Sequence, residues 1–189
     1  MDVSSTTRRR HGIGAALATL AAVALPAMLA RGAAAQAGRD TPAAVAESLI
    51  AADRAASSRA ARLPLADGLA AMFRDDVIAP GAPARLYRGL DEVRAYLRAS
   101  PDADARATWT PIRAGVSADG RHGFTFGFMT ATRADGATTP LKYMAYWIRD
   151  DDDTWRVAGY KRARRPDGEA SLTEMAPLLP GRLVSPTSD

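Results

Sequence analysis

The sequence contains no cysteine and only two histidines among its 189 residues. Without cysteine, the chain has no disulfide framework, no thiolate zinc site and no cysteine nucleophile. One histidine, His11, lies in the N-terminal segment, and the other, His122, stands between glycines near a predicted turn. A metal centre shared by two histidines is therefore not expected, and we interpret His122 as an exposed turn residue. We predict no bound metal and no cofactor.

A long, strongly apolar run is also missing. The most apolar stretch, 11–30, is rich in alanine and broken by Pro26, so it is marginal as a membrane-spanning helix. Three arginines precede it, and Ala-Gln-Ala at 35–37 supplies a cleavage pattern. This order is typical of a bacterial signal peptide, and the paired arginines are similar to a twin-arginine export signal. We predict a signal at 1–37 and an exported protein, periplasmic or secreted; the general secretory route and an uncleaved anchor are the alternatives.

The excess of positive charge belongs mostly to this N-terminal segment. The whole chain carries 25 basic and 21 acidic residues, and without residues 1–37 it keeps 21 basic and 20 acidic residues, a net charge of +1. A domain so close to neutral gives no reason to expect nucleic acid or an anionic membrane as a partner. The basic cluster at 161–165 is interpreted as a solvated strand end.

Residues 38–165 form the predicted domain, and helical spacing dominates its first half. Thr41 and Pro42 are typical of a helix start. Apolar residues then recur at helical spacing from Val45 to Ala56, which places Asp53 on the polar side. A second helix is predicted from Leu65 to Phe73, two short strands at 77–78 and 86–87 around a proline-rich turn, and a third helix over 90–97.

Period-two patterns take over in the second half. Four strands are predicted at 108–116, 124–132, 141–149 and 154–162. Two of their connections contain the Asp-Gly pair favoured in tight hairpins, and the third is the aspartate run 150–153. Helices followed by a run of hairpins predict an α+β fold, in which a curved antiparallel sheet packs on three helices. Residues 166–189, with four prolines, are predicted to be a C-terminal tail.

The order of these elements and several local strings resemble the nuclear transport factor 2-like superfamily, which includes SnoaL-like and ketosteroid-isomerase-like proteins. The strings are FRDDV at 73–77, YRG at 87–89 with Glu92 and Val93, and YMAYWIR at 143–149 with WRV at 155–157. The resemblance spans about 42–164 and is greatest for small exported domains of unknown function. It implies a cone-shaped fold whose helices and curved sheet enclose a cavity, often dimeric through the outer sheet face.

The resemblance does not carry over the catalytic base of the ketosteroid isomerases. In that branch a carboxylate precedes a proline after the Asp-Asp string, whereas here Ala79 precedes Pro80. An alanine cannot accept a proton. Asp76 and Tyr160 remain as candidate catalytic residues, and a solvated carboxylate at the end of a helix is the alternative interpretation of Asp76.

The aromatic residues of the stranded half are the better indication of a ligand site. Alternation places Phe124, Phe126 and Phe128 on one sheet face and separates Tyr146 from Tyr143. A buried phenol seeks a polar partner and suits a cavity wall, although ordinary core packing explains the same residues. The predicted ligand-binding residues are Tyr87, Trp109, Phe126, Met129, Tyr146 and Tyr160.

Three hypotheses of different classes follow. The first, which we take as the working hypothesis, is a non-catalytic domain that binds a small apolar or amphipathic molecule in the cone cavity. The second is a cofactor-independent isomerase or lyase in which an aspartate or tyrosine moves a proton. The third is an interaction module, whose second sheet face joins two subunits of a homodimer or binds a partner.

Overall fold

The structure is a computed structural model that describes Met1 and residues 41–184. Apart from Met1, the predicted signal at 1–37 lies outside the described residues. The described part contains no helix with the length and apolarity needed to cross a membrane. Residues 41–184 form three helices and six strands, in the order α2 (Pro42–Ala60), α3 (Leu65–Ala70), β1 (Phe73–Gly81), β2 (Arg85–Arg88), α4 (Leu90–Arg98), β3 (Arg106–Val116), β4 (His122–Thr132), β5 (Thr138–Arg149) and β6 (Trp155–Arg164).

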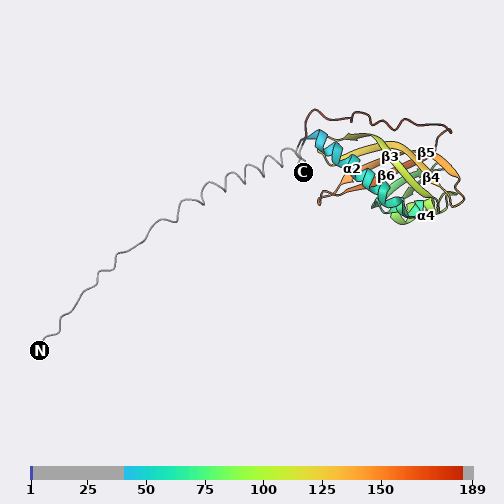
Figure 1. The fold of residues 1–189 in the computed structure, drawn as a ribbon, viewed down its shortest axis with the longest axis horizontal. Coiled ribbons are helices and arrows are strands. Elements are labelled where there is room, and N and C mark those ends of the chain that lie inside the picture. Colours follow the sequence, from blue (N-terminus) through green and yellow to red (C-terminus); the bar gives the residue numbers. More distant parts are fainter. Residues whose placement is uncertain (2–40, 185–189) are drawn as a thin grey trace. The chain divides into compact units, whose positions relative to one another are not determined.

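The six strands form one curved sheet in the order β2-β1-β6-β5-β4-β3. Figure 1 shows α2 and α4 lying across one face of this sheet. The predicted antiparallel pairing is confirmed for β3 to β6 and for β1 with β2. The pairing of β1 with β6 is parallel, so the sheet is mixed. That contact joins segments far apart in the sequence, and local patterns do not reveal it. The fold is the predicted α+β architecture.

Local sequence explains how the elements begin and turn. The Thr41 hydroxyl accepts a hydrogen bond from the Ala44 amide at 3.2 Å and caps α2, with Pro42 in its first turn. Gly120 and Gly136 have positive φ values of 68° and 83° at the two Asp-Gly hairpins. Glycine adopts this conformation without steric cost, which explains why these two predicted turns form where they do.

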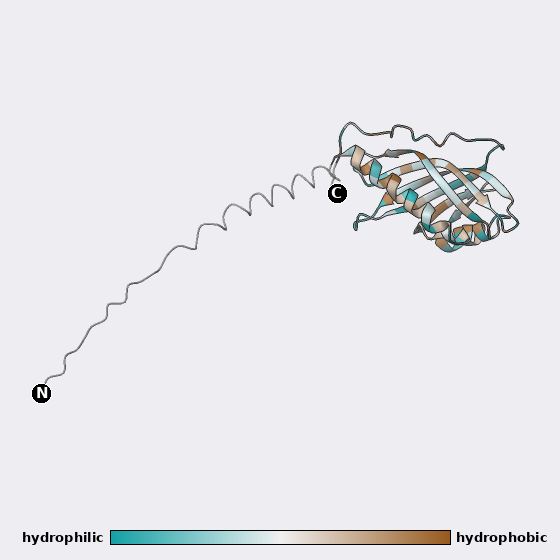
Figure 2. Cartoon of the chain, in the orientation of Figure 1, coloured by the Kyte–Doolittle hydropathy of each residue, from teal (hydrophilic) through white to brown (hydrophobic). Residues whose placement is uncertain are grey.

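Alternation along β5 defines the two faces of the sheet. Tyr143 and Trp147 are buried against the helices, on what we call the inner face. Met144 and Tyr146 point the other way and are 54% and 44% exposed, on what we call the outer face. A bulge between Pro111 and Arg113 shifts the alternation within β3. Figure 2 shows that α2, which covers the inner face, carries polar as well as apolar residues along its length.

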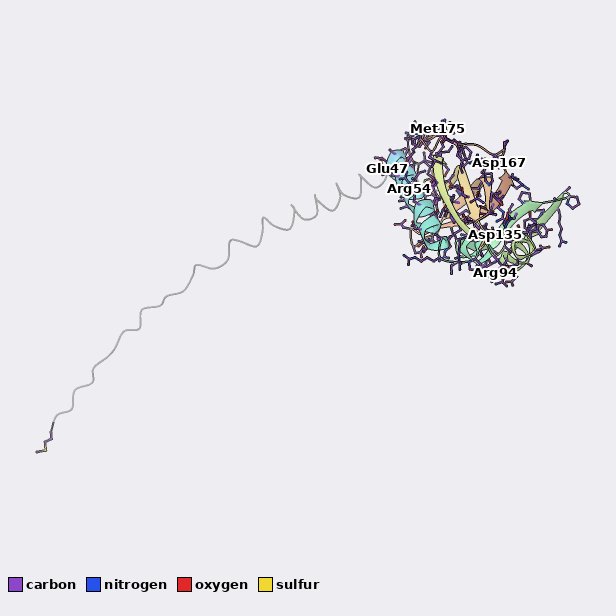
Figure 3. All side chains as sticks on the ribbon, turned by 45° about the vertical axis from the view of Figure 1, so that its right-hand side comes forward. Glu47, Arg54, Arg94, Asp135, Asp167 and Met175 are labelled. Carbon is purple, nitrogen blue, oxygen red and sulfur yellow. The ribbon has the colours of Figure 1, made fainter. Side chains whose placement is uncertain are left out.

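The C-terminal segment 166–184 follows the free edge of β3. The Met175 amide donates to the Ile112 carbonyl at 2.7 Å, and Leu178 pairs with Gly115 in a parallel bridge. In Figure 1 this segment, coloured dark red, runs as an extended chain along the sheet. Its Glu174 forms an ion pair with Arg54 of α2. Figure 3 labels Arg54 and Met175, the residue that follows Glu174 in the chain. The segment therefore covers part of an otherwise unpaired sheet edge.

The second helix is shorter than predicted. The sequence predicts a helix from Leu65 to Phe73, whereas α3 ends at Ala70 and Phe73 begins β1. The Val157 amide of β6 donates to the Met72 carbonyl at 2.9 Å, and the Phe73 ring lies 5.4 Å from the ring of Tyr160. This segment therefore forms a strand paired with β6, although its apolar residues have helical spacing.

Candidate functional site

A buried carboxylate stands at the centre of the inner face. Asp53 of α2 has no exposed surface, and its two oxygens accept hydrogen bonds from two different strands. The Trp109 indole of β3 donates to Oδ1 at 2.6 Å, and the Tyr143 hydroxyl of β5 donates to Oδ2 at 2.8 Å. We call these three residues the Asp53 cluster.

Burial dominates the electrostatics of the Asp53 cluster. It raises the pKa of the Asp53 carboxyl above its ordinary value, although hydrogen bonds from Trp109, Thr125 and Tyr143 favour the charged form. Burial, followed by the neighbouring charge of Asp53, also raises the pKa of the Tyr143 phenol. A carboxyl and a phenol in direct contact form the kind of pair that exchanges a proton in acid–base chemistry. Both groups are shielded from solvent, so we assign the cluster a structural role, the attachment of α2 to the sheet.

A second set of hydrogen bonds supports this attachment. The Ser57 hydroxyl, one turn after Asp53, donates to the Trp109 carbonyl and accepts from the Trp109 amide, both at 2.8 Å. The Trp147 indole donates to the Thr125 hydroxyl at 2.9 Å. These buried polar groups are therefore satisfied, and the two bonds of Ser57 fix the position of α2 along β3.

The placement of Asp53 corrects the prediction from helical spacing. The sequence assigned Asp53 to the polar side of the first helix, yet Val45, Leu49, Asp53 and Ser57 follow one another every four residues along one buried stripe. The error came from residue type, because a carboxylate is rarely buried unless it has partners. The strict four-residue spacing with two large apolar residues was the signal that could have found it.

The outer face carries an open apolar groove of about 480 Å³. Its walls are two rows of residues paired across β4, β5 and β6. One row is Phe126, Met144 and Lys161, and the other is Phe128, Lys142 and Ala163. The backbone of the intervening row, Gly127 with Tyr143 and Arg162, lies between them. We call this feature the sheet groove.

Positively charged residues lie at the margin of the sheet groove. Strands β3 to β6 contain eight lysine and arginine residues and no aspartate or glutamate. Lys142 and Lys161 stand in its walls, and the Lys161 ammonium donates to the Pro80 carbonyl at 2.9 Å. The Arg165 guanidinium lies 5.6 Å from the centre of the Phe128 ring. The groove therefore combines apolar surface with cations at its margin.

The structure divides the predicted ligand-binding residues among three places. Trp109, Met129 and Tyr160 are buried on the inner face, where the Tyr160 hydroxyl faces the Met129 sulfur at 4.0 Å. Phe126 and Tyr146 lie on the outer face, and Phe126 lines the sheet groove. Tyr87 of β2 stacks on Tyr96 of α4 with ring centres 4.2 Å apart. Lys142 and Lys161, which complete the groove, were not predicted, because no local pattern links them to the aromatic residues.

The two predicted catalytic candidates lie apart. Asp76 is 67% exposed and pairs with Arg74 at 2.9 Å, and the hydrogen bond from Arg74 lowers the pKa of its carboxyl. Tyr160 is buried, and burial raises the pKa of its phenol. Asp150, the first of the four consecutive aspartates, bonds to Arg74 and Arg156. No group of three histidine, aspartate or glutamate side chains suited to a metal ion occurs within residues 41–184.

Comparisons with known proteins find one matching family model and several similar solved structures. A family model described as SnoaL-like domain matches residues 64–158, half of the chain. No curated protein matches the sequence. A ketosteroid isomerase-like protein from Erwinia carotovora atroseptica is similar in structure, at 16% identity over 54% of this chain and 82% of that chain, with a TM-score of 0.42.

Two other solved structures are similar at the same level. A domain of unknown function with a cystatin-like fold from Nostoc punctiforme has 13% identity over 62% of this chain and 77% of its own, with a TM-score of 0.49. A Mycobacterium tuberculosis protein in complex with estradiol-17β-hemisuccinate has 16% identity over 61% of this chain and 91% of its own, with a TM-score of 0.43. These likenesses concern the fold alone. Because the family model matches half of the sequence, the chain belongs to the family of SnoaL-like domains.

Proposed function

We propose that this protein binds a small amphipathic anion in the sheet groove, with the apolar body between the two rows of side chains and the acidic group beside Lys142 and Lys161. The observation that carries the proposal is an open, almost wholly apolar groove whose charged lining residues, Lys142, Lys161 and Arg162, are all positive. From the sequence we predicted that the ligand binds inside the cone. The inner-face residues predicted for that role, Trp109, Met129 and Tyr160, are buried, whereas the groove is open to solvent.

The size of the groove supports a ligand of modest length. Pockets for small molecules commonly enclose roughly 300–1,000 Å³, and the sheet groove, at about 480 Å³, falls within that range. Phe126, Phe128 and Met144 provide aromatic and flexible apolar contacts. A fatty acid or an aryl sulfonate has the required combination of apolar body and single negative charge.

The proposal is tested by titrating the protein with laurate and, separately, with dodecanol, each by displacement of a fluorescent anilinonaphthalene sulfonate. We expect laurate to bind the more tightly, and Lys161→Gln to weaken laurate about five- to tenfold while leaving dodecanol unchanged. Met144→Glu, which places a carboxylate in the groove, should weaken laurate at least tenfold. Arg59→Gln removes one positive charge from the exposed side of α2 and serves as the matched control.

Equal laurate affinity in the unmodified protein, Lys161→Gln and Met144→Glu would refute the groove as the binding site. Laurate binding that Arg59→Gln weakens as much as Lys161→Gln would point to net charge rather than to the groove. Both results are read from the same titration, so the site and the charge effect are separated within one experiment.

A second candidate function is self-association through the outer face. What supports it is the exposure of three large apolar residues there, Ile78, Met144 and Tyr146. Light scattering after size exclusion measures the molecular mass directly. A dimer that Met144→Glu converts to a monomer, and that laurate does not dissociate, would favour self-association over the binding of an anion.

We also propose that binding takes place outside the cytoplasm, as the predicted signal at 1–37 suggests. Fractionation of bacterial cells that express the full chain tests this. Recovery of a shortened protein from the periplasm or the medium is expected, and full-length protein confined to the cytoplasm would contradict it.

A further inference from the structure

A second, smaller cavity of about 240 Å³ lies at the junction of β3, β4, β5 and the C-terminal segment. Val116 and Leu178 provide aliphatic walls, Phe124 and Tyr146 provide aromatic walls, and His122 lies at one side. We call it the His122 cavity. The cavity is open to solvent on one side, and its volume is that of a single substituted aromatic ring.

The walls of the His122 cavity are fixed by backbone contacts. The Leu178 amide donates to the Ala114 carbonyl at 2.9 Å, and the Val116 amide donates to the Leu178 carbonyl at 3.1 Å. Gly115 leaves room for the Phe124 ring, because a Cβ at this position would stand 2.3 Å from a ring carbon. Phe124 and Tyr146 therefore stand on paired strands, and Leu178 of the C-terminal segment is held against β3 by an isolated bridge.

The polar side of the cavity is a positioned imidazole. His122 Nδ1 lies 2.8 Å from the Tyr146 hydroxyl, and the two rings stack with an interplanar angle of 18°. His122 Nε2 lies 3.7 Å from Asp119 Oδ2, which is longer than a hydrogen bond. The Asp119 carboxylate is held in turn by the Ser117 hydroxyl and, at 2.9 Å, by the Arg121 amide. The Tyr146 hydroxyl thus orients the imidazole, whereas Nε2 has no hydrogen-bond partner within residues 41–184.

The charges near the imidazole select the kind of ligand. Burial acts against the charged form of Asp119, but hydrogen bonds from Ser117 and the Arg121 amide outweigh it, so the pKa of this carboxyl is lowered. An ionised Asp119 repels a ligand carboxylate. The Arg121 guanidinium is paired with Asp151. A neutral hydroxyl, by contrast, can donate a hydrogen bond to an imidazole nitrogen or accept one from it.

We propose that the His122 cavity is a binding site for a small phenol, whose ring lies between Phe124, Tyr146 and Leu178 and whose hydroxyl bonds to the Tyr146–His122 pair. This site is separate from the sheet groove: the groove takes an anion beside lysines, and the cavity takes a neutral hydroxyl beside a histidine. The two proposals stand on different residues and fail independently.

The test uses p-nitrophenol as the probe, titrated calorimetrically into the protein near neutral pH, where part of the phenol is protonated and an ordinary imidazole is mostly neutral. We expect saturable binding that His122→Ala weakens at least tenfold and Tyr146→Phe weakens three- to tenfold. p-Nitrobenzoate, of similar shape but ionised at the pH of the titration, should bind at least tenfold more weakly than p-nitrophenol. Ser58→Ala, at an exposed position of α2, and Lys161→Gln, in the sheet groove, should leave p-nitrophenol binding unchanged.

A second measurement keeps the test valid if His122→Ala does not fold. The chain has only two histidines, so the imidazole nitrogen resonances of His122 in the unmodified protein are readily assigned by comparison with His11→Ala. We expect them to shift on saturation with p-nitrophenol. Absence of binding, unchanged affinity in His122→Ala, or unshifted imidazole resonances at saturation would each overturn the proposal.

Discussion

Replacing Asp53 by leucine tests whether the Asp53 cluster fastens α2 to the sheet. Leucine is of similar size but accepts no hydrogen bond. The change would leave the Trp109 indole and the Tyr143 hydroxyl without their acceptor inside the protein, since both now bond to Asp53 at 2.6 and 2.8 Å. The expected result is a lower free energy of unfolding.

The magnitude follows from the number of donors left unpaired. A buried donor without a partner costs about 1–3 kcal/mol, so two donors cost about 2–6 kcal/mol. Part of this is offset, because the buried carboxylate no longer has to be desolvated. We expect Asp53→Leu to destabilise the fold by about 2–4 kcal/mol, a large share of the roughly 5–15 kcal/mol typical of a domain.

The assay is urea denaturation followed by circular dichroism, with Tyr143→Phe measured alone and in the Asp53→Leu background. Tyr143→Phe alone should be destabilising, because it removes a hydrogen bond. In the Asp53→Leu background it should restore about 1–2 kcal/mol, because it removes an unpaired hydroxyl. If Asp53→Leu is as stable as the unmodified protein, or if Tyr143→Phe destabilises both backgrounds equally, the cluster does not hold α2 in place as argued.

Three further outcomes follow from individual contacts. The pKa of the Asp53 carboxyl is raised in the folded state, so its contribution to stability is complete below the ordinary value of 3.8 and is lost as the pH rises through the folded-state pKa. Over that range the unmodified protein should lose stability relative to Asp53→Asn, as measured by urea titrations at several pH values. Thr41→Ala removes the cap of α2 and should cost about 1 kcal/mol in thermal unfolding, and an unchanged midpoint would contradict the capping role. Gly115→Ala forces the Phe124 ring aside and should cost about 1–3 kcal/mol while abolishing p-nitrophenol binding; retained binding would show that the ring does not shape the His122 cavity.

The strands could be predicted because their signals are local. The four long strands occur where alternation and Asp-Gly turns placed them, with ends shifted by a few residues. Alternation also assigned Tyr143 and Tyr146 correctly to opposite faces of β5. The bulge that changes the alternation in β3 lies between Pro111 and Arg113. Phe73 shows the limit of local signals, because its place in β1 depends on pairing with β6, more than eighty residues further along the chain.

The candidate sites were harder to predict, for a different physical reason. Asp53 looked like a surface residue because its burial is stabilised by donors on β3 and β5 that the helix sequence does not contain. The sheet groove joins Phe126, Met144 and Lys161, which come from three strands and meet only through the register of the sheet. Aromatic content indicated that the stranded half would hold a ligand surface, but only pairing shows which residues share one wall.

Salt dependence separates the two candidate uses of the outer face. Two copies packed through this face would bring Lys142 and Lys161 of each near those of the other, and strands β3 to β6 offer no acidic residue to compensate. At a separation of 4 Å, each like-charge pair costs about 1 kcal/mol in water and about 4 kcal/mol near a protein surface. Salt screens this repulsion over roughly 10 Å at 0.1 M, so added salt should strengthen a dimer.

The attraction between these lysines and a bound carboxylate is screened in the same way, so added salt should weaken laurate binding. Laurate affinity that falls between low and high salt, in a protein that stays monomeric, is the outcome expected for an anion site; association that rises with salt would assign the face to a second copy.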